Sequence, residues 1–144
     1  MESRDPYYLA CDPGKATGWA TWDDKGNPLD MGTVWSHDQL HDLLAAFPIT
    51  IKVVIVEDFT LFAKRAKSQI GSNMPASLAI GKIETFSKLW GAAFIKQSSS
   101  VKSIAERLTG HSTKGKPHNQ THVLDAYNLG EYWLIKNKIK QVKL

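Results

Sequence analysis

The sequence predicts an α/β protein built on a mixed five-stranded sheet with helices on both faces. Three observations support this class. Near the N-terminus, short apolar segments alternate with turn signals, which is typical of antiparallel strands. Residues 49–56 are almost entirely apolar, as in a central strand covered on both sides. In the segments that flank this strand, apolar residues recur at helical spacing, so helices are expected to pack on the sheet.

The first 35 residues predict three strands in an antiparallel meander. The strands are expected over 7–11, 17–22 and 29–35, each rich in apolar or β-branched residues. Asp-Pro-Gly at 12–14 and Asp-Lys-Gly-Asn at 24–27 are turn formers that separate them. Residues 49–56 then supply the fourth, central strand.

The middle of the chain predicts two helices separated by a loop. Ser36 with Gln39 three residues later forms a capping box, which predicts the start of the first helix. Residues 59–73 are polar, basic and contain glycine, so we expect an exposed loop there. Pro75 suits the first turn of a second helix, which should run to about Gly91.

The last third of the chain predicts one strand and two helices. A short strand is expected over 93–97, followed by a helix that Ser99 or Ser100 caps and Gly110 ends. After a basic loop, a long helix is expected over 119–137.

Size and composition predict one globular domain over residues 1–144, with a basic tail at about 136–144. The hydrophobic and charged fractions, 42% and 22%, are ordinary for such a domain. A start without a signal peptide and the lack of a long apolar run predict a cytoplasmic protein with no membrane contact. The single cysteine, Cys11, is expected to be a small buried apolar side chain.

Charge is unevenly distributed along the chain. Residues 96–144 hold nine Lys and Arg against three Asp and Glu, whereas residues 1–95 hold nine against eleven. A basic half of this kind is typical of proteins that bind a phosphate backbone, although basic tails also occur on ordinary solvated surfaces.

Three acidic residues and one histidine lie at positions from which the predicted strands and the last helix could bring them together in one site. Asp12 ends the first strand and Glu57 ends the central strand, while His122 and Asp125 lie three apart on the last helix and share one face. If the first and fourth strands are adjacent and parallel, Asp12 and Glu57 emerge at the same edge of the sheet. The last helix can then bring its two residues across that edge.

Such a cluster needs a cation, because converging carboxylates repel one another. Mg²⁺ prefers oxygen ligands, and two such ions about 4 Å apart can promote phosphodiester hydrolysis. Taken singly, each residue also has an ordinary explanation: Asp12 as a turn former, Glu57 as a strand end, His122 as a surface or capping residue, and Asp125 as an acid near a helix start. Their joint placement at matching ends of elements favours a metal site.

Four segments in order resemble a known family. LACDPGKATGW at 9–19, VIVEDF at 54–59, SSSVKSIAERLTG at 98–110 and THVLDAYNLG at 121–130 are similar to the motifs of RuvC-type Holliday-junction resolvases, which belong to the RNase H-like nucleases. The resemblance spans about residues 8–134. It implies an RNase H-like fold and a homodimer that binds branched DNA, the four-way junction of DNA recombination and repair. It also implies paired symmetric nicking with two Mg²⁺ ions per site and no nucleotide cofactor.

The resemblance carries over to individual residues. It implies Asp12, Glu57, His122 and Asp125 as catalytic metal ligands. Lys116, in the loop before the last helix, matches a basic position expected near the scissile phosphate, where it would also act in catalysis. Lys102 matches a lysine expected near the DNA backbone. His122 stands where many relatives have Asp, and imidazole would favour Mn²⁺ more than a carboxylate does.

The segment after Glu57 departs from the family pattern. Phe59 or Phe62 could stack at the junction centre, as an aromatic does in relatives, or pack in the core. Three basic residues of the same segment could contact phosphates or form a solvated loop: Lys64, Arg65 and Lys67. In the family the second helix contributes to the subunit contact, so its apolar residues are candidates for a dimer interface or for plain core: Leu78, Ile83 and Phe86.

Three other functions remain open on the sequence alone. An RNase H-like nuclease could act on another branched DNA or on RNA, and a protein with this fold could bind junctions without cutting them. The segment DPGKATG also resembles the phosphate loop of actin-like kinases, but those proteins need two lobes and more than twice this length.

Overall fold

Five strands form a mixed sheet at the centre of the computed structural model, which describes residues 5–58, 63–112, 114–116 and 118–141. The strand order is β3-β2-β1-β4-β5. The antiparallel pairs are β1 with β2 and β2 with β3, and β4 is parallel to both β1 and β5. The strands are β1 (Tyr8–Asp12), β2 (Thr17–Trp22), β3 (Pro28–Val34), β4 (Val53–Asp58) and β5 (Ala93–Ser98).

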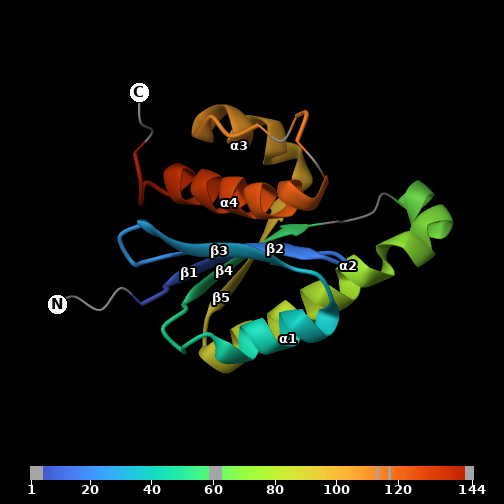
Figure 1. Ribbon diagram of the computed structural model, residues 1–144, viewed down its shortest axis with the longest axis horizontal. Coiled ribbons are helices and arrows are strands. Elements are labelled where there is room, and N and C mark those ends of the chain that lie inside the picture. The colour runs from blue at the N-terminus through green and yellow to red at the C-terminus, as the bar shows by residue number, and fades with distance from the viewer. Residues whose placement is uncertain (1–4, 59–62, 113, 117, 142–144) are drawn as a thin grey trace.

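Helices cover both faces of this sheet, which confirms the predicted fold class. Figure 1 shows α1 and α2 on one side of the strands, and α3 and α4 on the other. The helices are α1 (His37–Ala46), α2 (Ala63–Trp90), α3 (Lys102–Thr109) and α4 (His118–Lys136), with a 3₁₀ turn (Ser99–Val101) before α3. Within the described residues, none of these helices combines the length and apolar character needed to cross a bilayer.

Side-chain alternation along β1 divides the core into two clusters. Leu9 and Cys11 point to the cluster that also holds residues of α1 and α2, and Cys11 is completely buried, as expected. Tyr8 and Ala10 point the other way, to the cluster beneath α4. Because successive strand residues face opposite sides, Asp12 belongs with Tyr8 and Ala10 on the α4 side.

The same alternation places Glu57 on the α4 side. On β4, Val54 and Val56 belong to the α1–α2 cluster and Ile55 to the α4 cluster. Glu57 is two residues beyond Ile55 and so shares its face. In the parallel register Cys11 is level with Val56, so the next residues along the two strands, both acids, end side by side.

A glycine on β2 lets α4 lie directly on the sheet. A Cβ atom at Gly18 would overlap the backbone carbonyl of His122 and crowd the nitrogen of Val123. The absence of a side chain at this point therefore determines how closely the first turns of α4 approach the ends of the strands.

The start of α1 has the predicted capping box. The Ser36 hydroxyl accepts a hydrogen bond from the Gln39 backbone N–H at 3.1 Å. The Gln39 side-chain oxygen in turn accepts one from the Trp35 backbone N–H at 2.8 Å. The first bond satisfies a backbone donor that the first helical turn leaves open, and the second ties the helix to the residue before its N-cap, so the two hold the β3–α1 junction in one conformation.

The predicted exposed loop over 59–73 is wrong for its larger part, because α2 begins at Ala63. Residues 59–62 lie outside the described residues. Alanine, lysine, arginine and glutamine are strong helix formers, and they outweigh the single Gly71. Pro75 lies inside the helix rather than in its first turn, and proline removes a helical hydrogen bond and bends the helix axis. Figure 1 shows α2 bent along its length.

Two smaller boundaries also differ from the prediction. The central strand begins at Val53, where its pairing with Tyr8 of β1 starts; Ile49 lies in a turn and is 71% exposed. The helix α3 begins after a 3₁₀ turn with Val101 at the N-cap, so no serine caps it by a side-chain bond. Gly110 ends α3 with a φ of 75°, as predicted.

Candidate functional site

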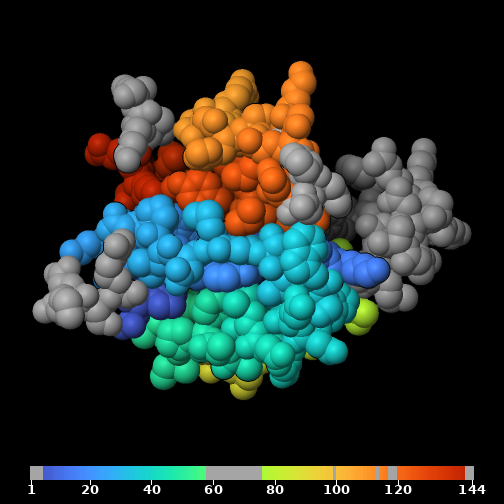
Figure 2. Space-filling view, in the orientation of Figure 1, coloured from blue at the N-terminus to red at the C-terminus, as the bar shows by residue number. Residues whose placement is uncertain are grey.

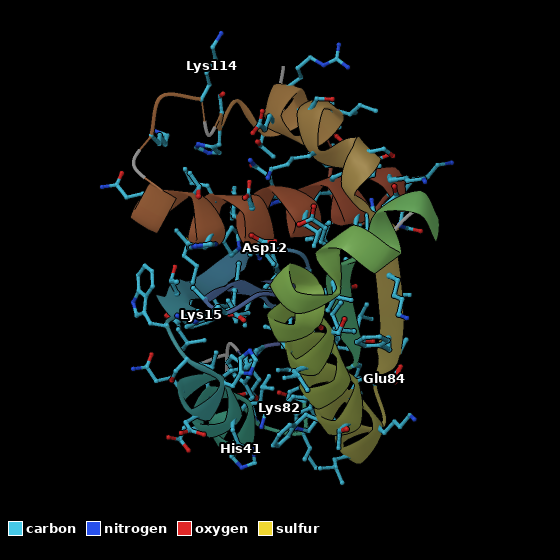
Figure 3. The ribbon with its side chains drawn as sticks, turned by 90° about the vertical axis from the view of Figure 1, so that its right-hand side faces the viewer. Asp12, Lys15, His41, Lys82, Glu84 and Lys114 are labelled. Carbon is cyan, nitrogen blue, oxygen red and sulfur yellow. The ribbon has the colours of Figure 1, made fainter. Side chains whose placement is uncertain are left out.

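Asp12 and Glu57 meet at the carboxyl ends of the two central parallel strands. Both are buried, each with 8% of its surface exposed. The conditional prediction that the first and fourth strands are adjacent and parallel is confirmed by the β1–β4 register. Figure 3 shows Asp12 at the end of the sheet beneath α4.

The first turns of α4 bring two more of the predicted residues to this point. His122 Nδ1 lies 3.8 Å from Asp12 Oδ2. Asp125, one turn further along the helix, is paired through Oδ2 with the Lys102 ammonium of α3 at 3.0 Å. The other oxygen of Asp125, Oδ1, is buried and has no hydrogen-bond partner among the described residues. The structure thus joins the four predicted ligands and Lys102 in one cluster, the carboxylate cluster.

Burial and mutual repulsion oppose ionisation of the acids in the carboxylate cluster. Burial, a hydrogen bond with Asp12 and the charge of Asp12 together raise the pKa of Glu57 to about 8. Burial also raises the pKa of Asp125, and the Asp12 charge adds to this shift, although the Lys102 pair opposes it. The protein alone therefore supplies less positive charge than these carboxyl groups need to ionise together.

The same acids favour the charged forms of the two basic groups of the cluster, His122 and Lys102. The hydrogen bond to Asp12 raises the pKa of His122 in spite of its partial burial. Burial lowers the pKa of the Lys102 ammonium, but the bond to Asp125 and the nearby acids more than offset this, so its pKa is raised. His122 and Lys102 are thus held towards their protonated forms by the same acids.

The donors of the carboxylate cluster fit a divalent cation, although the side chains are not arranged around one. Three carboxylates and an imidazole are suitable ligands for Mg²⁺ or Mn²⁺. The unpartnered Oδ1 of Asp125 and the raised pKa of Glu57 indicate a need for positive charge. Across the described part of the chain, however, no three His, Cys, Asp or Glu side chains are grouped to hold a metal ion. Lys102 holds Asp125 in its ion pair, so metal binding would require these side chains to move.

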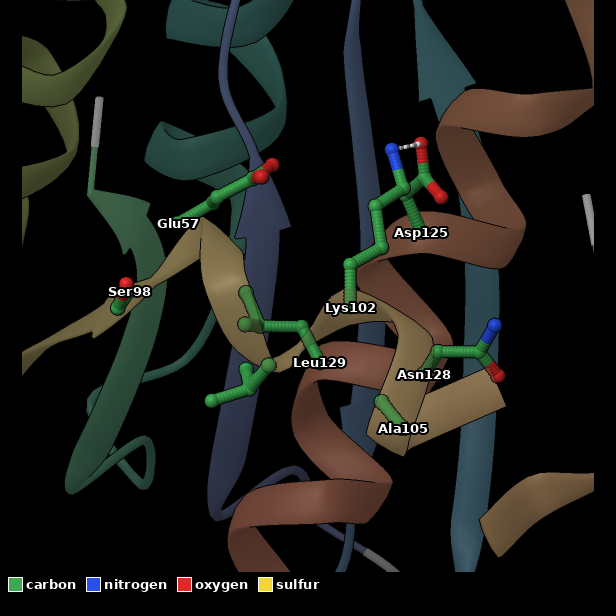
Figure 4. A pocket seen from close by; sticks show the side chains of 8 residues that line it. Glu57, Ser98, Lys102, Ala105, Asp125, Asn128 and Leu129 are labelled. Carbon is green, nitrogen blue, oxygen red and sulfur yellow. Dashed lines mark ion pairs between the residues drawn. The ribbon is translucent and has the colours of Figure 1, made fainter. Parts of the chain in front are cut away.

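A small cavity lies beside the Lys102–Asp125 pair. Its volume is about 20 Å³, enough for about one water molecule. Figure 4 shows the Lys102–Asp125 pair at this cavity and the Glu57 carboxylate pointing towards it. Apolar side chains and Asn128 close its lower part; the lining residues are Glu57, Ser98, Val101, Lys102, Ala105, Asp125, Asn128 and Leu129.

The remaining predicted residues lie elsewhere. Lys116 is exposed in the loop between α3 and α4. Phe59 and Phe62 lie outside the described residues. Three basic residues belong to α2 rather than to a loop, and their side chains are outside the described part: Lys64, Arg65 and Lys67.

Of the three α2 candidates for a dimer interface, only Leu78 is at the surface. It is 56% exposed, whereas Ile83 is completely buried and Phe86 packs against the same core cluster. The competing interpretation as core is therefore confirmed for Ile83 and Phe86.

Sequence reasoning missed Gln97 and did not predict the ion pair of Lys102 within the cluster. Lys102 was expected near the DNA backbone, but it is ion-paired inside the carboxylate cluster. Gln97 of β5 is level with Glu57, is buried, and its Nε2 has no hydrogen-bond partner among the described residues. A polar residue at the alternate, inward position of a short strand was the available signal for Gln97. The docking of α3 that places Lys102 has no comparable local signal.

Comparisons with known proteins give similarity in structure and none in sequence. No protein-family model matches the chain, and no curated protein matches its sequence. A T. thermophilus RuvC structure in complex with a Holliday-junction substrate has a TM-score of 0.64 at 14% identity, over 92% of this chain and 96% of that one. The fowlpox virus Holliday junction resolvase has a TM-score of 0.57 at 14% identity, over 90% and 98%. The chain therefore has the RNase H-like fold.

Proposed function

We propose that this protein is a metal-dependent endonuclease that cuts four-way DNA junctions. The observation that carries the proposal is the meeting of Asp12, Glu57, His122 and Asp125 at the carboxyl ends of β1 and β4. Burying such a set of acids lowers the stability of the folded protein, and binding of a cation or substrate is the function that would retain them. The two similar structures, one a RuvC with a Holliday junction and one a junction resolvase, support the choice of substrate.

The four predicted ligands would hold two Mg²⁺ ions, with Mn²⁺ as an alternative. When bound, such ions activate a water molecule and stabilise the leaving oxygen of a phosphodiester. Asp12 is close to both Glu57 and His122 and would orient them. The Lys102 ammonium, released from Asp125, would neutralise charge on the phosphate, and Lys116 would approach it from the α3–α4 loop.

Two identical sites are needed to cut two opposing strands symmetrically, so we include a homodimer in the proposal. Substrate affinity would come largely from the basic residues of 96–144. Figure 1 shows that α3, α4 and the segment after α4, in orange to red, lie together on one side of the sheet. Backbone phosphates of a junction arm would be attracted to that side.

Cleavage of a synthetic four-way junction tests the proposal. The wild type should nick it in Mg²⁺ and not in EDTA, and Asp12→Asn should lower the rate at least about a hundredfold. The matched control is Asp42→Asn, the same change at an exposed position of α1 on the opposite face of the sheet. Equal cutting by the wild type and Asp12→Asn would refute the assignment.

The nearest rival keeps the nuclease site and changes the substrate. A panel of junction, flap, plain duplex and RNA–DNA hybrid, compared at one salt concentration, separates the two. Preference for the junction of at least tenfold over every other substrate is expected. Equal or faster cutting of a flap or hybrid would favour the rival, and metal-independent binding without nicking would indicate a non-catalytic junction-binding protein.

A further inference from the structure

A second, larger cavity opens beside the carboxylate cluster, and Lys102 is not among the residues that line it. Its volume is about 440 Å³, within the range of small-ligand pockets. It is lined by Asp12 and His122 of the carboxylate cluster, by the 13–16 loop and by Trp35. A molecule in this cavity would therefore touch two of the predicted metal ligands directly.

Trp35 presents an open aromatic surface to this cavity. It is 50% exposed, whereas Trp22 and Trp90 are buried, at 0% and 6%. Its ring meets the His122 ring edge to face, with 6.1 Å between centroids. The capping-box bond from its backbone N–H to Gln39 fixes the main chain at this position. An exposed tryptophan on a fixed backbone is a preformed stacking platform.

The 13–16 loop, which also lines the cavity, is tied to the same β3–α1 junction. A ring nitrogen of His37, the first residue of α1, lies 3.2 Å from the Gly14 carbonyl oxygen. Lys15, next in the loop, is exposed and lines the cavity. Figure 2 shows the 13–16 loop, in blue, emerging beside the cyan β3–α1 junction, and Figure 3 shows Lys15 near Asp12.

We propose that this cavity binds one nucleotide of the strand that is cut, with its base stacked on Trp35 and a phosphate next to Lys15. The inference rests on the proposed nuclease function and specifies its substrate contacts. A flat aromatic face, one cation and the predicted metal ligands Asp12 and His122 match a base, a backbone phosphate and the neighbouring scissile phosphate. An apolar ligand would leave Lys15 unused and would bring no anion to the carboxylate cluster.

Fluorescence of 2-aminopurine tests the stacking without cleavage. The probe base is placed in turn at positions flanking the branch of a four-way junction, and binding is followed in EDTA and in Ca²⁺. The wild type should quench the probe at one or more positions. Trp35→Ala should remove this quenching and weaken binding about fivefold to a hundredfold, whereas Trp35→Phe should retain most of both. Lys15→Gln should weaken binding and reduce its salt dependence.

A matched control is Ile49→Ala, at an exposed apolar residue in the turn before β4, which should bind and quench like the wild type. Circular dichroism and melting temperature confirm that each variant is folded. Unchanged affinity and quenching in Trp35→Ala would overturn the inference; if its nicking alone fell, Trp35 would act only by positioning His122. A wild type that stacks the probe through Trp35 but never nicks would refute the nuclease proposal and leave the nucleotide subsite standing.

Discussion

At the scale of single residues, Glu57 shows that the acids of the site need added positive charge before they ionise together. Its carboxyl group is buried, and Asp12 beside it disfavours a second negative charge, which together raise its pKa to about 8. An acid that keeps its proton near neutral pH is a poor metal ligand until a cation displaces that proton. Metal binding should therefore release protons and become tighter as the pH rises.

The raised pKa of Glu57 predicts how stability depends on pH in EDTA. Because the folded-state pKa exceeds the unfolded value of about 4.3, the protonated folded form is favoured below that value, and this contribution is lost as the pH rises through about 8. Between pH 5 and 8, the free energy of unfolding of the wild type should fall by about 1–3 kcal/mol relative to Glu57→Gln, which cannot ionise. Urea unfolding of both proteins at each pH measures this. Parallel pH profiles would show that Glu57 titrates normally.

Lys102 competes with any cation for Asp125, and this predicts a variant that binds metal better. Its ammonium lies 3.0 Å from Asp125 Oδ2. Lys102→Met removes that positive charge, so Mn²⁺ affinity should rise about threefold to tenfold by calorimetry, while junction cleavage falls. Lys88→Met, at an exposed position of α2, is the matched control. Weaker Mn²⁺ binding by Lys102→Met would mean that the lysine organises the ligands instead of competing with the ion.

At the scale of elements, the contact between β2 and α4 decides whether the site forms. Gly18→Ala places a Cβ atom against the backbone of α4 at His122, and backbone atoms cannot move unless the helix moves with them. We expect a loss of about 2–3 kcal/mol in the free energy of unfolding. Cleavage should also fall, because His122 and Asp125 shift with the helix.

The control for that substitution lies in α2. Gly81 is helical, and a Cβ there would meet nothing within 4 Å. Gly81→Ala should stabilise the protein by up to about 1 kcal/mol and leave cleavage unchanged. Thermal or urea unfolding of both variants makes the comparison, and equal effects at the two glycines would remove the argument for a close β2–α4 contact.

The elements also show which features local sequence patterns predict and which depend on tertiary contacts. The strand β2, the capping box at Ser36 and the Gly110 helix end follow from local patterns, and the structure confirms them. The start of α2 does not, because Gly71 and Pro75 are helix-breaking signals that the surrounding helix formers override. The place of Lys102 depends on how α3 docks on α4, which is a tertiary contact with no local pattern.

At the scale of the whole molecule, the two faces of the sheet differ in what they offer a partner. The α3–α4 side holds the carboxylate cluster and most of the basic second half of the chain. The α2 side is where the family resemblance expects the subunit contact. On α2, Leu78 and Leu89 are 56% and 71% exposed. Eleven residues apart, they share one face of a helix with 3.6 residues per turn.

Exposed leucines on a shared face predict the behaviour of a double variant. If α2 forms the dimer contact, Leu78→Lys with Leu89→Lys places like charges across the symmetric interface and exposes nothing new in the monomer. Light scattering after size exclusion should show a dimer for the wild type and a monomer for the variant. The monomer should still bind Mn²⁺, because the carboxylate cluster lies within one chain, but it should nick a junction once instead of twice. The control Ile49→Lys changes an equally exposed residue away from α2. A variant that stays dimeric would move the subunit contact to another surface and leave the site within each chain unaffected.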